Sequence, residues 1–287
     1  MAELQLIFWD VQHGSAAYIR TPGDQHIALD LGTGSVGASN EAFSPLRYLR
    51  DRYGVRQLDC VVISHPHRDH LDDIFQFDAM SPRCLSRPKH LSEAEIRGGN
   101  QAKDTPIINK YLEINRRYSG TFGPGEDPLD ANNNGGVTFQ TFTPTSPPTS
   151  NLNNHSMVTV VTYAGSKILI PGDNEAASWK ELLGWSDFRS AIGGTDILVA
   201  AHHGRASGFS ETLFEYISPR LTIASDGPVG GTSITGTYSQ RSRGWKVYSR
   251  RGGSEVRKCL TTRSDGVVIV RFGTEASGSN YMNVTIE

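Results

Sequence analysis

Short runs of apolar residues, many of them β-branched or aromatic, recur along the first part of the chain and end at turn residues. These runs predict strands at 4–9, 16–20 and 26–31, which HGS and PGD turns separate. A nearly continuous apolar run at 58–63, LDCVVI, is typical of a buried strand. Apolar side chains at helical spacing predict a helix at 42–53. The N-terminal part is therefore expected to be rich in strands.

The rest of the chain alternates strands with helices in a similar way. Runs at 157–163 and 167–170 predict a hairpin that turns at Ala164-Gly165-Ser166. The other predicted elements are helices at 71–77, 105–118, 175–183 and 209–217, and strands at 137–142, 197–201, 221–224, 246–249, 256–261, 267–272 and 282–286. Because helices lie between groups of strands in both halves, we expect an α/β (α+β) fold in which two sheets pack face to face with helices outside.

One long segment departs from this alternation. Residues 92–154 contain GPGEDP, NNNGG and PTSPPTS, which are typical of surface loops. Chemically interesting residues lie on both sides of it, so we expect one domain over 1–287 with an insertion or lid at 92–154 rather than a linker between two domains. Such an insertion also offers a docking surface for a protein partner.

Composition narrows the class of protein. With 287 residues and a net charge of −2, the chain is not a generally basic nucleic-acid coat. Its three cysteines include no Cys-x-x-Cys pair, which argues against a disulfide framework and a cysteine zinc finger. The N-terminal sequence has no signal-peptide pattern, and no apolar stretch approaches the ~20 residues of a membrane span. We therefore expect a cytoplasmic protein without a membrane partner.

Histidines cluster directly after the buried strand. The segment SHPHRDH places four possible ligands, His65, His67, Asp69 and His70, within six residues. Imidazole and carboxylate together suit zinc, manganese or iron, and these ligands are more than one ion needs. The alternative is a polar loop whose histidines only form hydrogen bonds, but four ligands at this spacing are hard to assemble by chance. The pattern favours a site for two metal ions.

Further polar residues stand where other strands are predicted to end. Asp173 follows ILIPG, His202 and His203 follow ILVAA, and Asp30 follows IAL. A lone aspartate after a glycine would usually cap a turn. Here, however, Asp173 stands at a predicted strand end, as the histidine clusters do. This shared position favours a role for Asp173 as a metal ligand.

The order Asp30, HPHRDH, PGD and HHG resembles the metallo-β-lactamase fold superfamily. The blocks FWDVQHGSAAYIRTPG, VVISHPHRDHLDDI, NNHSMVTVVTYAGSKILIPGD and DILVAAHHGRASG resemble the hydrolase domain of ComEC-type DNA-uptake competence proteins. The resemblance runs from about residue 5 to residue 226. It implies a four-layer αββα sandwich with a dinuclear metal site between the sheets.

The resemblance also implies two groups of ligands that share one carboxylate: His65 and His67 for the first ion, Asp69, His70 and His202 for the second, and Asp173 for both. His203 would line the pocket and contact the substrate or donate a proton. A third histidine usually completes the first group. His155 in NNHS is the candidate here, although ComEC-like relatives often carry Asn at this position. His13 in QHGSA either reaches the mouth of the site or caps a turn.

Two divalent ions, zinc or manganese, about 3.5–4 Å apart would activate water and neutralise charge on phosphoryl oxygens. Together with the basic C-terminal part, the resemblance implies a phosphodiesterase or nuclease acting on DNA, with Asp69, Asp173 and His203 as catalytic residues. Either His203 or His202 would protonate the leaving group. The alternatives are a small-molecule hydrolase, for a phosphocholine ester, cyclic nucleotide, lactone or thioester, and a non-catalytic binding module stabilised by metal.

The C-terminal part at 238–287 is locally basic. From 241 to 263 there are eight basic residues and one acidic residue, with Trp245 and Tyr248 among them and Tyr238 shortly before. Basic and aromatic side chains together suit a phosphate backbone with occasional base stacking. The predicted nucleic-acid contacts are Arg241, Arg243, Lys246, Arg250 and Arg251. The alternative is a solvated pair of surface strands.

Overall fold

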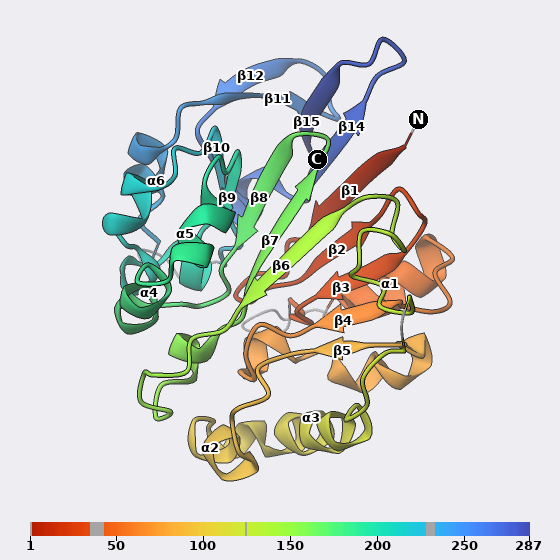
Figure 1. The fold of residues 1–287 in the computed structure, drawn as a ribbon, viewed down its shortest axis with the longest axis vertical. Coiled ribbons are helices and arrows are strands. Elements are labelled where there is room, and N and C mark those ends of the chain that lie inside the picture. Colours follow the sequence, from red (N-terminus) through yellow and green to blue (C-terminus); the bar gives the residue numbers. More distant parts are fainter. Residues whose placement is uncertain (1, 35–42, 124, 228–232) are drawn as a thin grey trace.

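The computed structural model describes residues 2–34, 43–123, 125–227 and 233–287, and its strands form two sheets (Figure 1). The nine-stranded sheet has the order β12-β11-β15-β14-β1-β2-β3-β4-β5. Its strands are β1 (Glu3–Phe8), β2 (Ala17–Arg20), β3 (His26–Leu29), β4 (Cys60–Val62), β5 (Leu85–Ser86), β11 (Trp245–Ser249), β12 (Ser254–Arg257), β14 (Val268–Thr274) and β15 (Asn280–Ile286). The six-stranded sheet has the order β13-β10-β9-β8-β7-β6. Its strands are β6 (Thr138–Phe142), β7 (Val158–Tyr163), β8 (Ser166–Ile170), β9 (Ile197–Val199), β10 (Leu221–Ala224) and β13 (Cys259–Thr261).

The strands alternate between two buried faces, and β1 illustrates the pattern. Leu4, Leu6 and Phe8 point into a core that also contains Ile168 of β8 and Ile223 of β10, so this core lies between the two sheets. A strand with a second buried face must also be covered on the outside, because successive side chains point in opposite directions. The outer faces of both sheets are therefore expected to carry helices.

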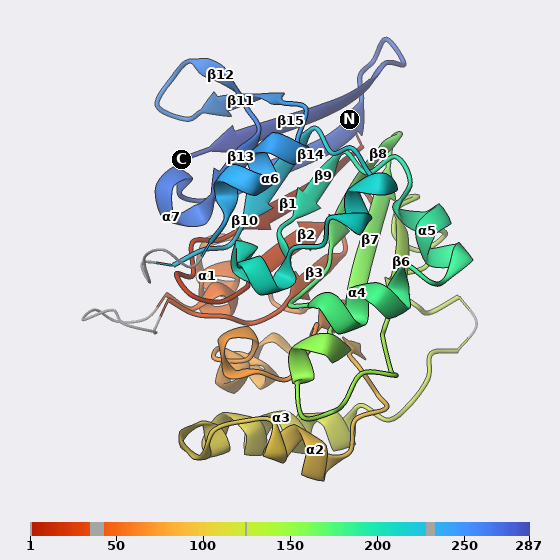
Figure 2. The same cartoon turned by 90° about the vertical axis from the view of Figure 1, so that its left-hand side faces the viewer.

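Helices do cover both outer faces (Figure 2). The described helices are α1 (Pro45–Arg52), α2 (Glu93–Gly98), α3 (Thr105–Arg117), α4 (Ala176–Leu182), α5 (Ser186–Ile192), α6 (Thr235–Arg241) and α7 (Thr262–Asp265). Leu46 of α1 and Tyr111 of α3 pack with residues of the nine-stranded sheet. Trp179 of α4, Phe188 of α5 and Tyr238 of α6 pack against the six-stranded sheet. The predicted αββα sandwich is confirmed.

Several boundaries differ from the prediction. The predicted strand at 256–261 is two strands, because β12 pairs with β11 in one sheet and β13 pairs with β10 in the other. The predicted helices at 71–77 and 209–217 contain only short 3-10 turns, at Ile74–Gln76 and Thr212–Glu215. Helix α2 was not predicted, although Ser92 and Glu95 form a capping box at its start.

The segment at 92–154 contributes to the core more than its loop-rich sequence suggests. Ile108, Tyr111 and Leu112 of α3 are buried in the outer core of the nine-stranded sheet. Strand β6 pairs antiparallel with β7 and forms the edge of the other sheet. Turns and loops connect these two elements. In the part of the chain that the structure describes, no helix combines the length and the apolar character that a membrane span requires.

Candidate metal centre

The polar residues singled out in the sequence follow the carboxyl ends of parallel strands in both sheets. His65, His67, Asp69 and His70 follow β4, Asp173 follows β8, and His202 and His203 follow β9. Strands β8, β9 and β10 are parallel to one another, as are β3, β4 and β5. Parallel strands deliver the residues after their carboxyl ends to one edge of a sheet, where open α/β sheets bind ligands.

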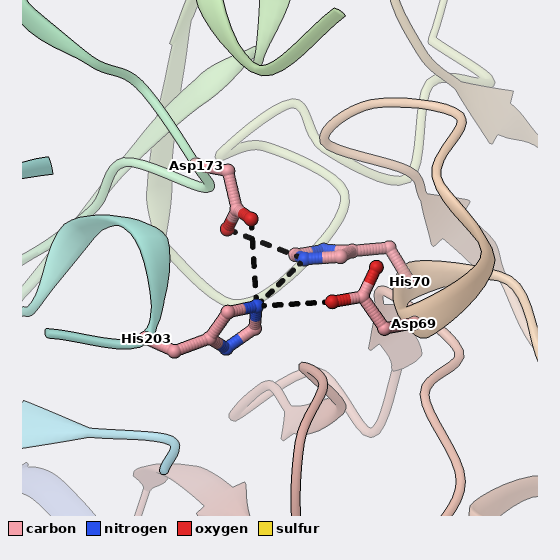
Figure 3. Close-up of side chains that lie close together, drawn as sticks. All are labelled: Asp69, His70, Asp173 and His203. Atoms are coloured by element: carbon pink, nitrogen blue, oxygen red, sulfur yellow. Dashed lines mark hydrogen bonds and ion pairs between the residues drawn. The ribbon is translucent and has the colours of Figure 1, made fainter. Parts of the chain in front are cut away.

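Four of these side chains meet at one point (Figure 3). Asp69, His70, Asp173 and His203 each present one ligand atom, and these atoms all lie within 4.8 Å of one another. Nε2 of His203 is 3.3 Å from Oδ2 of Asp69 and 3.4 Å from Oδ2 of Asp173. Nε2 of His70 is 3.2 Å from Oδ1 of Asp173. Two imidazoles and two carboxylates in this arrangement are a suitable donor set for a divalent transition metal.

Asp30 orients one of these ligands instead of joining them. Its carboxylate is 2.8 Å from Nδ1 of His70 and accepts hydrogen bonds from the backbone N–H of Ser64 at 2.7 Å and from its hydroxyl at 2.9 Å. A carboxylate on Nδ1 fixes the imidazole tautomer and leaves Nε2 for a metal. The left-handed backbone of Asp30, with φ 53°, lets its side chain reach this loop. The sequence identified Asp30 but not this role.

His203 is held by a similar arrangement. Its Nδ1 is 3.0 Å from the carbonyl oxygen of Ser225, the residue after β10, so Nε2 faces the other ligands. His202 and His203 both have left-handed backbone, with φ 49° and 55°. Such a conformation costs about 1–3 kcal/mol per non-glycine residue and concentrates at functional sites. The N–H of His202 donates to the carbonyl of Gly172 at 3.1 Å, which ties this turn to the one bearing Asp173.

His202 lies beside the group formed by the four ligands. Its Nε2 is 3.8 Å from Oδ2 of Asp173, and its Nδ1 is 3.0 Å from Oε1 of Glu175 and 2.8 Å from the hydroxyl of Ser207. The structure therefore brings His203, and not His202, into contact with Asp69 and His70. The sequence analysis did not single out Glu175. Its position two residues after Asp173 was the signal that could have identified it.

His65 and His67 lie beside the clustered side chains, and the ring centroid of His65 is 4.3 Å from that of His70. Nε2 of the fully buried His65 is 3.0 Å from Nδ1 of His67 and 3.9 Å from Oδ2 of Asp173. The two rings meet edge to face, with centroids 4.7 Å apart. Nε2 of His65 thus lies near both His67 and Asp173, and Asp173 also contacts His70 and His203.

His155 is completely buried, and its Nε2 has no hydrogen-bond partner among the described residues. Its Nδ1 is 2.9 Å from Nε2 of His90, a contact that the sequence did not suggest. His155 precedes Ser156 and Met157, and the N–H of Met157 donates to the carbonyl of Ser64 at 2.8 Å, beside the HPHRDH loop. A buried imidazole nitrogen without a partner is costly unless something else occupies it, and a metal ion would do so.

Asp173 is fixed by close packing around the turn that carries it. Its backbone N–H donates to the hydroxyl of Ser156 at 3.0 Å. Gly172 has φ 61°, and a Cβ there would lie 2.9 Å from Cβ of Ser64 and 3.0 Å from Cβ of Ser156. Only glycine fits this left-handed position between two chain segments. The PGD sequence is thus required both by the turn and by the packing.

The buried charges shift one another's protonation. Burial favours the neutral form of His203, but the carboxylates of Asp173 and Asp69 outweigh this effect and raise its pKa to about 9. The pKa of His70 is raised well above its ordinary value in the same way, by Asp173 and Asp30. Burial would raise the pKa of Asp173, but His203 and His70 hold it well below the usual range. Burial, together with His70 and His67, lowers the pKa of His65.

The centre opens on a hollow of about 270 Å³. Its walls are His13, His67, Arg68, Asp69, Gly99, Asn100, Gln101, Lys103 and Asp104. Nε2 of His13 is 3.5 Å from Oδ2 of Asp69, and its ring centroid is 5.0 Å from that of His203. His13 therefore lies at the mouth of the centre, one of the two positions considered for it. Residues 99–104 of the 92–154 segment form the opposite wall.

The five basic residues expected to contact nucleic acid lie elsewhere. Arg243 donates to the carbonyl of Ser218 at 2.9 Å, before β10 begins, and therefore lies at the opposite end of that strand from the centre. Arg241 pairs with Glu211, and Arg250 pairs with Glu287 at 2.9 Å. Lys246 lies over the ring of Tyr248, and Arg251 is exposed between β11 and β12. The structure does not bring these residues to the candidate metal centre.

Comparison with known proteins gives distant relatives. No family model matches the sequence. The chain is 32% identical over 218 residues to Recombination protein 2 of Haemophilus influenzae and 26% identical over 228 residues to Competence protein ComA of Neisseria gonorrhoeae. These matches cover 76% and 78% of the chain but 24% and 27% of those proteins. The chain thus spans about a quarter of the length of the curated relatives it matches.

A solved structure with a similar arrangement is the metallo-β-lactamase fold protein YhfI from Bacillus subtilis. It is 13% identical to this chain, with a TM-score of 0.40, and the match covers 91% of this chain and 87% of YhfI.

Proposed function

We propose that this chain is a metal-dependent hydrolase of the metallo-β-lactamase fold that cleaves phosphodiester bonds of DNA. The observation that carries the proposal is the meeting of Asp69, His70, Asp173 and His203 at the carboxyl ends of strands from both sheets. The names of the two sequence relatives, a competence protein and a recombination protein, support DNA as the substrate.

The residues present fit two divalent ions, zinc or manganese. The four clustered ligands suit one ion, and His65, His67 and His155 with Asp173 suit the other. Nε2 of the buried His155 has no hydrogen-bond partner among the described residues, which supports grouping His155 with His65, His67 and Asp173. Divalent ions bound there would lower the pKa of water toward neutrality and neutralise charge on the phosphoryl oxygens.

The side chains around these ligands would control protons and orientation. Asp30 on Nδ1 of His70, and the Ser225 carbonyl on Nδ1 of His203, leave each Nε2 free to bind a metal. His202 has Glu175 on its Nδ1, while its Nε2 faces the centre. This pairing supports His202 as the proton donor to the leaving oxygen, with His203 as a ligand. A histidine in that role contributes about 10²–10⁴-fold to the rate.

The test is a substrate panel. Purified protein is stripped of metal, reloaded with Zn²⁺ or Mn²⁺, and offered labelled single- and double-stranded DNA, bis(p-nitrophenyl) phosphate, a phosphocholine ester, a lactone and a thioester. We expect cleavage of DNA and of the small diester, with the stripped protein as the matched inactive control.

Other results would contradict the proposal in distinct ways. Cleavage of the lactone or thioester without any phosphodiester would identify a small-molecule hydrolase. Metal-loaded protein that cleaves none of the panel would identify a metal-stabilised binding module.

A further inference from the structure

Among the described residues, one half-buried arginine at the mouth of the centre, Arg205, forms no ion pair with a carboxylate. Arg205 follows His202-His203-Gly204 directly and is partly buried. Among the described residues, no carboxylate lies within 4.0 Å of its guanidinium, and its Nε is buried without a hydrogen-bond partner. Guanidinium groups are rarely buried unpaired, because removing a charge from water is costly. Such a side chain is suited to binding an anion.

The backbone around Arg205 is rigid. Its N–H donates to the carbonyl of His202 at 3.0 Å, and the residue forms an isolated β-bridge with Ser233. The ligand His203 is two residues before it. The position of Arg205 relative to the metal centre is therefore fixed by the same turn that fixes His203.

The side chain contacts the centre through His13. Nη2 of Arg205 is 3.2 Å from Nε2 of His13, which is itself 3.5 Å from Oδ2 of Asp69. A guanidinium has five N–H donors in a planar fork, and this contact uses only one of them. The Nε–H is buried, and the remaining N–H groups on Nη1 and Nη2 are the ones available for phosphate oxygens, which Arg recognises in bidentate geometry.

A second cation stands on the far wall of the hollow. Lys103 lies within the 3-10 turn Ala102–Asp104, is exposed, and has no carboxylate within 4.0 Å among the described residues. Its neighbour Arg68 is different, because its charge is balanced by Asp72 at 2.9 Å and by Asp104 at 3.6 Å. Two cations without a carboxylate partner among the described residues thus lie near the centre, Arg205 beside His13 and Lys103 on the wall of the hollow.

We propose that Arg205, supported by His13, binds a phosphate next to the one cleaved, so that the backbone of a nucleic-acid strand crosses the mouth between Arg205 and Lys103. This proposal rests on the proposed function. On this proposal, the mouth of the centre makes the protein select a polyanionic strand over a small ester. The basic C-terminal part does not make this selection. A small diester has no neighbouring phosphate and gains less from Arg205.

The test compares Arg205→Met with Arg205→Lys and with the control Arg56→Met. Methionine keeps much of the side-chain length and removes the charge. Arg56 is exposed, forms no ion pair with a described residue, and precedes β4, at the opposite end of that strand from HPHRDH. Binding of a cleavage-resistant phosphorothioate oligonucleotide to metal-loaded protein is measured by fluorescence anisotropy over a range of salt, and KM and kcat are measured with DNA and with bis(p-nitrophenyl) phosphate.

Arg205→Met should weaken oligonucleotide binding about tenfold, since a charge-assisted contact is lost. It should also reduce the slope of log K against log salt by about one. KM for DNA should rise more than KM for the small diester. Arg205→Lys should restore part of the binding, and Arg56→Met should match the unmodified protein.

Two failures are distinguishable. Oligonucleotide binding and salt slope that are the same in Arg205→Met as in the unmodified protein would overturn this proposal, whatever the enzyme cleaves. Absence of phosphodiester cleavage by the unmodified protein would overturn the proposed function, while the binding measurement would still decide whether Arg205 holds a phosphate.

Discussion

Two regions of this molecule carry positive charge beside aromatic or imidazole side chains, and they differ in what balances that charge. In the C-terminal part, Arg241 and Arg250 face Glu211 and Glu287, and Arg257 lies 3.0 Å from Asp265. At the mouth of the metal centre, Arg205 faces a histidine and no described carboxylate. Arg243, Lys246 and Arg251 of the C-terminal part face no described carboxylate either. A count of basic residues therefore favours the C-terminal part as the nucleic-acid contact, whereas closeness to the candidate ligands favours the mouth.

The two regions also differ in their distance from the candidate ligands. Five strands, β15, β14, β1, β2 and β3, lie between β11 and β4 in the nine-stranded sheet. At about 4.8 Å per strand step, the β11–β12 hairpin is on the order of 30 Å along the sheet from the strand that leads to HPHRDH. A phosphate held at the hairpin is thus not the phosphate that the centre would cleave. The comparison teaches that local composition identifies basic segments but not their relation to a site.

The largest effect is expected from replacing a candidate ligand of the metal centre itself. Asp173→Asn should lower phosphodiester hydrolysis by about 10³-fold or more, because it removes the carboxylate that lies next to both groups of ligands. The fold should remain, since the apolar strands are untouched, and circular dichroism should show it. Activity equal to that of the unmodified protein would remove Asp173 from the metal centre. Metal analysis of the same samples should show fewer ions per chain than in the unmodified protein.

The next experiment distinguishes the roles of the adjacent histidines His202 and His203. His203→Ala should lose about one ion per chain, because His203 contacts Asp69 and Asp173. His202→Ala should keep the ions and lose activity about a hundredfold, because the proposed proton donor is gone. Metal content is measured by mass spectrometry and rates with bis(p-nitrophenyl) phosphate. The opposite pattern, ion loss in His202→Ala alone, would reassign the ligand to His202.

The metal centre should also respond to pH, through its affinity for metal, in a way that the C-terminal part does not. A metal must displace the proton from His203, whose pKa is raised to about 9 in the metal-free protein. Metal affinity should therefore rise about tenfold per pH unit for each displaced proton up to about pH 9, as a competition titration with a chelator would measure. A pH-independent affinity between pH 6 and 9 would contradict the charged state of His203.

The stability of the metal-free protein should show the reverse trend. The ion pairs of His203 stabilise the fold fully below about pH 6.5, the ordinary histidine pKa, and this contribution is lost as pH rises through about 9. Thermal unfolding without metal should thus occur at lower temperature at pH 9 than at pH 6.5, while the gain in stability on adding metal grows.

The smallest effect concerns the C-terminal part. Replacing Arg250 and Arg251 together by Met should weaken binding of a long oligonucleotide by about threefold and leave a short one unaffected, because about 30 Å of DNA is on the order of ten base pairs. Anisotropy titrations with strands of two lengths measure the difference. An equal loss for both lengths would place the hairpin beside the cleaved phosphate and favour the C-terminal part over Arg205.

The sequence predicted which residue types would meet, because HPHRDH, PGD and HHG each follow a predicted buried strand. It could not decide between His202 and His203. Both residues adopt left-handed backbone, and the usual alternation of side chains along an extended chain therefore does not apply to them. Asp30 was recognised for the same reason as Asp173, but its contact with Nδ1 of His70 depends on a fold-dependent approach of β3 and the loop after β4.

The αββα architecture was predicted correctly, but individual elements were missed where apolar periodicity was absent. Helix α6, with the sequence TGTYSQR, buries only Tyr238, so it has no helical stripe to detect. The segment 256–261 has a strand-like composition throughout, and nothing local in it shows that its two halves pair in different sheets. Arg205 was passed over because an arginine in a loop is ordinary until the structure shows that it faces His13 and no described carboxylate.

The pairing of β1 with β14 has a consequence for the time course of folding. Glu3 pairs with Gly273, so β1 has one open edge until residue 273, 270 positions further along the chain, has been synthesised. At about 5–20 residues per second, that interval is on the order of tens of seconds. His70 and His203 are 133 positions apart, so metal cannot bind them together for much of this time. An unpaired strand edge invites pairing with other chains. Newly made chains should therefore depend on chaperones for longer than a protein whose strands pair with close neighbours.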